Sequence, residues 1–280
     1  MTSNNPKTDL WNIMKNISTT YYYLDKFERY EMNTFVEDNA KLSTIGNEMF
    51  KNFGLDNIDI SFFVDVCAAP GMYSKIIFES RPSSKITGIG ISLPPEKGGV
   101  EFDFVHANYK QFYKDILEKQ YKLDIPKKLD FGMGSCVSYV DDKKNSHQLN
   151  MELIIISSNI VMSNLALGGN MIVNMSMKNI YTCYNVLYLL QKYFTEIKLW
   201  KSSIVWGTKN TFYIFCYNFR MNEYSNDILN YINDIKNNNS KLNTTFIGDK
   251  RSFDIITNLL NPIYIVRINC WLNVIGNKKN

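Results

Sequence analysis

SFFVDVCAAPGMYSKIIFES, residues 61–80, joins two kinds of hydrophobic pattern. Residues 61–66 are mostly apolar, with β-branched and aromatic side chains, which predicts a buried strand. Small residues and the pair Pro70-Gly71 follow, and they predict a tight turn. From Tyr73 onward, apolar side chains recur at the spacing of a helix. The stretch therefore predicts a strand, a turn and a helix in succession, as in an α/β protein.

This succession is typical of a cofactor site of the nucleotide type. In such a site the chain leaves a strand in a tight turn, and the next helix begins at the ligand. Small side chains in the turn let the backbone approach the cofactor closely. Asp65, at the end of the predicted strand, is placed to accept hydrogen bonds from that cofactor. An ordinary strand–turn–helix unit without a ligand is the alternative interpretation.

Length and composition indicate one folded domain with extensions. The chain has 280 residues, of which 45% are hydrophobic and 14% aromatic, and this is enough for a sizeable core. Polar residues interrupt the longest apolar run, residues 153–167, so that it falls short of the ~18 residues that span a bilayer. The N-terminus lacks the basic-then-apolar pattern of a secretion signal. We therefore expect no association with membranes.

Cysteine spacing and net charge indicate the cellular environment and the class of partner. The five cysteines form no CxxC pair, so they suggest neither a metal site nor a disulfide framework, and we expect a reducing, cytoplasmic environment. The net charge of +4 is compatible with a nucleic-acid partner. Asn, Ile, Tyr and Lys are frequent, as in the AT-rich genomes of many large viruses and cytoplasmic plasmids. We expect such an origin, with the protein in the host cytoplasm or the virion.

The run DVCAAPGMYSKII resembles motif I of the FtsJ-like S-adenosylmethionine-dependent RNA 2'-O-methyltransferases, which reads D-x-C-A-[AG]-P-G-G-[FW]-S. Met72 stands where the family usually has a second Gly. The resemblance implies a Rossmann-like α/β methyltransferase fold, S-adenosylmethionine as the cofactor, and RNA such as capped mRNA as the partner. The residues that match the motif are Asp65, Cys67, Ala68, Pro70, Gly71 and Ser74.

Further patterns extend the resemblance over residues 35–219. KITGIGISL, residues 85–93, is a predicted strand and resembles the G-[FY]-G-[MI]-T-L of the cap-specific branch. EFDFVHANY, residues 101–109, resembles D-F-x-x-G-D-F, in which the Asp faces the adenine; that position is Asn108 here, and an amide can still bond to an adenine edge. The resemblance implies cofactor binding by Asp65, Cys67, Ala68, Ala69, Pro70, Gly71, Ser92 and Asn108.

Periodicity divides the rest of the chain. We expect an N-terminal helical extension over residues 1–58, the methyltransferase domain over 59–219, and a C-terminal extension over 220–280. In the domain we expect helices over 109–120, 149–167 and 180–194, and strands over 129–134, 171–175, 196–201 and 212–217. The last two strands resemble the antiparallel hairpin that closes the family's sheet. In the C-terminal extension we expect helices over 221–236 and 252–260 and a strand over 263–275.

FtsJ-like enzymes share a Lys-Asp-Lys-Glu tetrad, whose second Lys interacts with the acceptor hydroxyl. Burial and neighbouring charges tune the pKa of that amine. Position by position, the tetrad falls on Lys41, Ser135, Asn174 and Thr211, so three of its four charges are absent. The loss of one such group typically lowers the rate ~10²–10⁴-fold. Lys41 has a second interpretation as an ordinary solvated lysine of a helix.

Two functions from different classes follow from the resemblance. The first is a non-catalytic or regulatory subunit of an RNA-capping or RNA-modifying assembly, with a capping enzyme as a candidate partner protein. This first function predicts an apolar surface that faces the partner. Candidates for that surface are Trp11, Trp200, Trp206 and Trp271, and the alternative is that each of them belongs to the core. The second is an active RNA (cap) ribose 2'-O-methyltransferase that uses relocated groups such as Lys41 and Lys178. A methyltransferase for another acceptor, such as a ring nitrogen, is a third interpretation.

Overall fold

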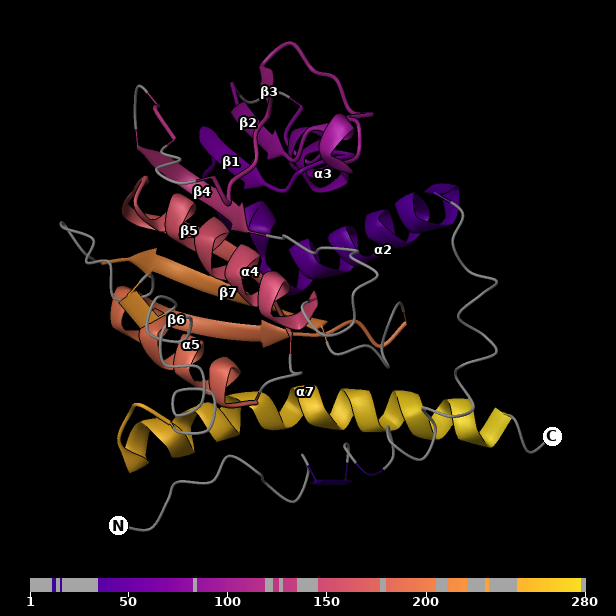
Figure 1. Ribbon diagram of the computed structural model, residues 1–280, viewed down its shortest axis with the longest axis vertical. Coiled ribbons are helices and arrows are strands. Elements are labelled where there is room, and N and C mark those ends of the chain that lie inside the picture. Colours follow the sequence, from indigo (N-terminus) through magenta and orange to yellow (C-terminus); the bar gives the residue numbers. More distant parts are fainter. Residues whose placement is uncertain are drawn as a thin grey trace.

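One mixed sheet organises the protein (Figure 1). The computed structural model describes residues 12–13, 16, 35–82, 85–118, 123–125, 128–134, 146–176, 180–204, 211–220, 230–231 and 246–277. Within these residues, seven strands pair in the order β3-β2-β1-β4-β5-β7-β6. All neighbours are parallel except those of β7, which runs antiparallel to both β5 and β6. This is the Rossmann-like α/β fold that the sequence predicted.

Helices cover both faces of the sheet (Figure 1). The strands are β1 (Phe62–Val66), β2 (Thr87–Ser92), β3 (Tyr109–Tyr113), β4 (Leu129–Gly134), β5 (Leu165–Ser176), β6 (Phe194–Trp200) and β7 (Thr211–Phe219). The helices are α2 (Phe35–Phe53), α3 (Met72–Glu79), α4 (Ser146–Met162), α5 (Ile180–Tyr193) and α7 (Lys250–Asn277), with the short 3-10 turns η1 (Leu55–Asn57) and η2 (Pro95–Lys97). Residues of α2 and α3 share one core with the sheet, and those of α4, α5 and α7 share the other.

Strand β1 is buried along its whole length because it lies between these two cores. Phe62, Val64 and Val66 point into the core under α4, whereas Phe63 points into the core under α2 and α3. The period of two also directs Asp65 to the α3 face. A charged residue therefore stands inside the sheet, next to the start of α3.

Most predicted elements are confirmed. The unit β1–turn–α3 matches the sequence pattern, and β2, β4 and α5 lie where periodicity placed them. The hairpin β6–β7 closes the sheet as expected. Helix α2 ends before Gly54, which adopts a left-handed conformation with φ of 65°. The predicted N-terminal helix and the helix over 221–236 lie outside the described residues, apart from a few positions.

Three predicted elements are wrong. Residues 109–113 form strand β3 rather than a helix, because buried Tyr109 and exposed Lys110 begin an alternation of period two beside β2. Helix α4 ends at Met162, and the residues before the Gly168-Gly169 pair already belong to β5. Residues 263–275 continue helix α7 through Pro262 instead of forming a strand.

The contact between α4 and β4 is close enough to test. A Cβ atom at Gly132 of β4 would lie 2.3 Å from a methyl carbon of Val161 in α4. We expect Gly132→Ala to lower the free energy of unfolding by ~1–3 kcal/mol through overpacking, and Val161→Ala to lower it by a similar ~1–3 kcal/mol through a cavity. The double variant should lose clearly less than the sum in urea denaturation. Additive losses would show that these two residues do not touch.

Candidate cofactor site and acceptor pocket

The carboxyl ends of β1, β2 and β3 meet at one edge of the sheet. The strands are parallel, and the last residues of β1 and β2 pair as Val66 with Ile91, while Ser92 pairs with Tyr113. The strand order reverses at β1, which lies between β2 and β4. In open α/β sheets, ligands bind beside the carboxyl ends at such a reversal. The structure brings Asp65, the turn 67–71 and Ser92 together at this edge.

The turn after β1 needs left-handed backbone at two positions. Cys67 has φ of 67° and Gly71 has φ of 104°. The amides of Cys67 and Ala68 donate hydrogen bonds to the carbonyl of Ile91, at 2.7 and 3.0 Å, so that the turn is tied to β2. A Cβ atom at Gly71 would lie 2.9 Å from Cβ of Phe104, so only glycine fits there. The turn is therefore a fixed backbone cradle.

Asp65 lies beneath this turn and is completely buried. Its Oδ2 accepts a hydrogen bond of 2.9 Å from Ser74 Oγ, which also lies 2.9 Å from the hydroxyl of Tyr109. Its Oδ1 has no hydrogen-bond partner among the described residues. Burial raises the pKa of Asp65 to about 7, and the bond from Ser74 opposes this rise only in part. A buried oxygen without a donor is a place for a ligand donor or cation.

The cysteines differ from the expectation in one respect. The sulfur of Cys67 belongs to a disulfide, which the scattered spacing did not predict. Cys183, Cys216 and Cys270 are free. The described His, Cys, Asp and Glu residues form no cluster that could hold a metal ion. None of the described helices is long and apolar enough to cross a membrane.

Asn108 is not brought to this edge. It immediately precedes β3, and its carbonyl accepts a hydrogen bond of 2.9 Å from the amide of Gly88, near the start of β2. It therefore lies at the amino ends of the strands, opposite the turn after β1. The second residue after β3, at the carboxyl edge, is the half-buried Asp115. Recognition of YKQFY as a strand would have pointed to this carboxylate.

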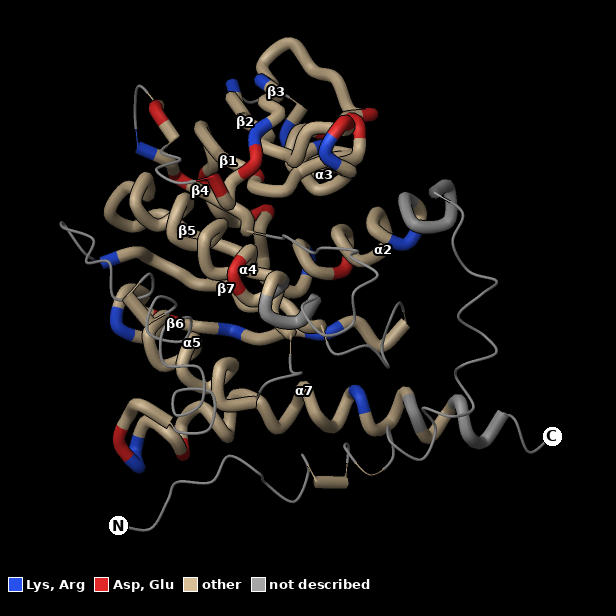
Figure 2. Tube along the Cα trace, in the orientation of Figure 1, with Lys and Arg blue, Asp and Glu red and all other residues tan. Residues whose placement is uncertain are grey.

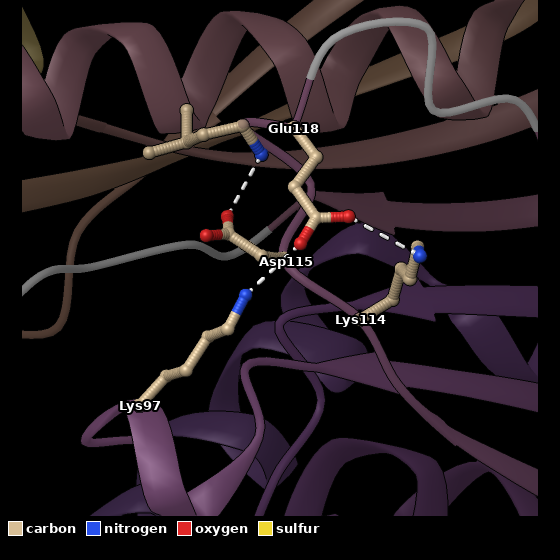
Figure 3. A network of polar contacts seen from close by, with 5 residues as sticks. Lys97, Lys114, Asp115 and Glu118 are labelled. Atoms are coloured by element: carbon tan, nitrogen blue, oxygen red, sulfur yellow. Dashed lines mark hydrogen bonds and ion pairs between the residues drawn. The ribbon is translucent and has the colours of Figure 1, made fainter.

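A polar network fixes the loop that carries Asp115 (Figure 3). Asp115 Oδ1 accepts a hydrogen bond of 3.0 Å from the amide of Leu117. Glu118 binds Lys97, which follows β2, at 2.9 Å, and Lys114, which follows β3, at 3.2 Å. These ion pairs are exposed, so they position the loops more than they stabilise the fold. They join the loops at the carboxyl ends of two neighbouring strands.

On the expected acceptor side, the described residues of β5 and β7 are neutral. Asn174 of β5 is 7% exposed, and its Oδ1 has no hydrogen-bond partner among the described residues. It pairs across the sheet with Tyr213, whose hydroxyl lies 2.8 Å from that of Tyr73 at the start of α3. Thr211 opens β7 beside Ser176. An amide, two phenols and an alcohol therefore occupy this side of the sheet.

Two described lysines, Lys41 and Lys201, bear on this site. Lys41 is half-buried in α2, while Ser135 and Lys178 lie outside the described residues. Lys201, which sequence reasoning missed, is 5% exposed, and its Nζ donates to the carbonyl of Thr211 at 2.8 Å. Burial, with a contribution from Arg267, lowers the pKa of Lys201 to about 7. Because Arg267 belongs to α7, this amine lies on the opposite face of the sheet from Asn174.

The tryptophans give little support to a partner surface. Trp200 packs against Phe53 and Tyr213, with ring centroids 6.5 and 5.9 Å apart, so it belongs to the core side of the sheet. Trp11 and Trp206 lie outside the described residues, and the side chain of Trp271 is not described.

Comparisons with known proteins agree with this fold. A profile of the FtsJ-like methyltransferase family matches residues 41–219. No curated protein sequence matches the chain. A crystal structure of a ribosomal RNA methyltransferase from Plasmodium falciparum is 18% identical, with a TM-score of 0.51, over 63% of this chain and 96% of that one. An O-methyltransferase from Thermotoga maritima is 15% identical, with a TM-score of 0.41, over 69% of this chain and 68% of that one.

The burial of Asp65 predicts a pH-dependent stability. Its folded pKa of about 7 lies above the ordinary value of 3.8, so between these values the folded state holds a proton that the unfolded chain releases. Stability therefore falls as the pH rises from about 4 to 7. We expect Asp65→Asn to remove this slope, worth a few kcal/mol at about 1.4 kcal/mol per pKa unit, in denaturant titrations at pH 5 and pH 8.

The exposed Asp124→Asn is the matched control for this measurement. It should keep the slope of the unaltered protein. If Asp65→Asn also kept this slope, Asp65 would not contribute to it. Its carboxyl group would then be ionised in the folded protein at pH 5, and the burial argument would fail.

Proposed function

Because the chain belongs to the FtsJ-like methyltransferase family, we propose that it binds S-adenosylmethionine and RNA without itself methylating a ribose hydroxyl. The cofactor of this family is S-adenosylmethionine. The observation that carries the proposal is the contrast between two sites at the same edge of the sheet. Below the turn after β1, the buried Asp65 has one oxygen without a described hydrogen-bond partner. Asn174 and Thr211, in contrast, stand where charged groups are expected.

The residues at the carboxyl edge fit the cofactor. When bound, S-adenosylmethionine supplies an electrophilic methyl carbon on a sulfonium. Asp65 offers Oδ1 as an acceptor, and the left-handed backbone at Cys67 and Gly71 lets the main chain come close. Ser92 ends β2 at the same edge. Asp115 replaces Asn108 as our candidate for the residue that contacts the adenine.

The described residues of the acceptor side do not fit deprotonation of an alcohol. A ribose hydroxyl is a poor nucleophile until a base removes or polarises its proton. The Asn174 amide has no basic lone pair at neutral pH and carries no positive charge. Lys201 has a lowered pKa, but it lies under α7 on the other face of the sheet. We therefore favour a regulatory subunit in an RNA-modifying or RNA-capping assembly over an enzyme.

The alternative is an active RNA ribose 2'-O-methyltransferase. Lys41 is the one tetrad position that keeps its charge, and it is held in α2 on the same side of the sheet as Asn174. Glu48, two helical turns further along α2, accepts a hydrogen bond of 2.9 Å from Ser202 next to the β6–β7 end of the sheet. These groups favour the alternative only if they reach the acceptor hydroxyl.

Binding and transfer can be measured separately. We expect calorimetry to show saturable binding of S-adenosylmethionine, and assays with a labelled methyl group to show no transfer to capped or uncapped RNA above background. A known ribose 2'-O-methyltransferase serves as the positive control. Transfer that Lys41→Ala abolishes would instead support the active enzyme and refute our proposal. Failure to bind S-adenosylmethionine would refute the cofactor part of the proposal.

The placement of the adenine end has its own test. We expect Asp115→Ala to weaken S-adenosylmethionine binding by about tenfold or more, because it removes a hydrogen bond to a charged group, worth ~1.5–3 kcal/mol. Asn108→Ala is the matched control at the opposite edge of the sheet, and it should leave the dissociation constant unchanged. A reversed result would place the adenine near the amino ends of the strands.

A further inference from the structure

Exposed apolar side chains gather at the β3 edge of the sheet. Among the described residues, large hydrophobic side chains with substantial exposure are concentrated between positions 100 and 117: Val100, Val105, Phe112, Tyr113 and Leu117. Phe112 is the aromatic side chain of this group that points away from Tyr109 and the α2–α3 core. Figure 2 shows that charged residues also concentrate around β2, β3 and α3, while α4, β5 and β7 carry few.

The alternation of β3 places Lys110 and Phe112 on one face, and Lys114 directly follows the strand. Successive strand residues point to opposite sides, so Lys110 and Phe112 share a side. Phe112 is 47% exposed and Lys114 is 48% exposed. Their neighbours in β2 on this face are buried, since Ile91, the partner of Phe112, is 0% exposed. Phe112 thus prolongs an apolar core surface to the sheet edge.

No described helix shields this ring. Helix α4 packs on β4, β5 and β1, and α5 and α7 pack further along the sheet toward β6. In the sequence the connection from β3 to β4 contains no described helix that could cover the edge strand. An aromatic ring therefore stays accessible between two lysines in the sequence.

We propose that Lys110, Phe112 and Lys114 form a platform for single-stranded RNA. One base stacks on the Phe112 ring, and the two ammonium groups contact the phosphates on either side. Exposed aromatic rings with flanking cations are how sheets bind single strands with little sequence preference. This inference rests on the proposed function, because it takes RNA as the partner class. The platform is continuous with the proposed cofactor site, since Asp115 follows Lys114 directly.

Charge favours RNA over a protein here. Both cations lie within two residues of the exposed ring, and a phosphate can replace the exposed partner of Lys114, Glu118, at little cost. Lys97 is joined to the same carboxylate and adds a third cation at the edge of the platform. A protein partner would instead use the exposed apolar side chains of Val105 and Leu117.

Fluorescence anisotropy with labelled oligouridylate and the full-length protein tests the platform. We expect Phe112→Ala to weaken binding about 5- to 100-fold, as the loss of one stacked base does. Phe112→Trp should retain affinity, because its ring still stacks. Lys110→Ala and Lys114→Ala should each lower the slope of log affinity against log salt by about 0.7, the contribution of one phosphate contact to a single strand. Ile265→Ala, equally exposed on α7, is the matched control.

The outcomes separate this inference from the proposed function. Calorimetry with S-adenosylmethionine on the two Phe112 variants should show unchanged cofactor binding. If the unaltered protein binds RNA and Phe112→Ala binds it equally well, the platform is refuted while the proposed function stands. If the unaltered protein binds the cofactor but no RNA, both the platform and the RNA part of the proposed function fail. Thermal melting of Phe112→Ala and Phe112→Trp should match that of the unaltered protein.

Discussion

The structure depends on a carboxyl group placed inside a sheet. Strand β1 has its apolar residues in both cores, so any side chain in it loses contact with water. Asp65 nevertheless stands in this strand, with one oxygen bonded to Ser74 and the other without a described partner. A buried acceptor without a donor is destabilising by ~1–3 kcal/mol. The turn, the first residues of α3 and the loop before β3 are all arranged around this group.

Most of the fold prediction rested on local sequence patterns, and most of its errors came from packing between distant segments. The unit around Asp65 is encoded within twenty residues, so the sequence alone indicated its strand, turn and helix. Strand β3 has only five residues and lies at an edge, where the apolar Phe112 is exposed and hides its alternation. The expected adenine contact at Asn108 came from a motif resemblance, whereas the structure places Asn108 at the amino end of this strand and Asp115 beyond its carboxyl end.

Packing between distant segments explains the other errors. Residues 263–275 alternate in hydrophobicity, yet Ile263, Tyr264 and Arg267 are buried together because α7 lies against α5 and β6. The same helix buries Lys201, which comes some sixty positions earlier in the chain. A single lysine after a strand gives no signal of burial in the sequence. Its lowered pKa is a product of tertiary contacts, as are the neutral surroundings of Asn174.

The two faces of the sheet carry different functional groups. Asp65 and Asn174 lie on the α2–α3 face, and Lys201, the described lysine with a strongly lowered pKa, lies on the α7 face. A ligand that bonds Asp65 stabilises the folded state in proportion to its affinity and concentration, whether or not a reaction follows. A chain that keeps the buried acid therefore gains stability from its cofactor even under our proposal that it transfers no methyl group. For such a protein, the bound cofactor acts as a structural ligand that completes the fold at the carboxyl edge.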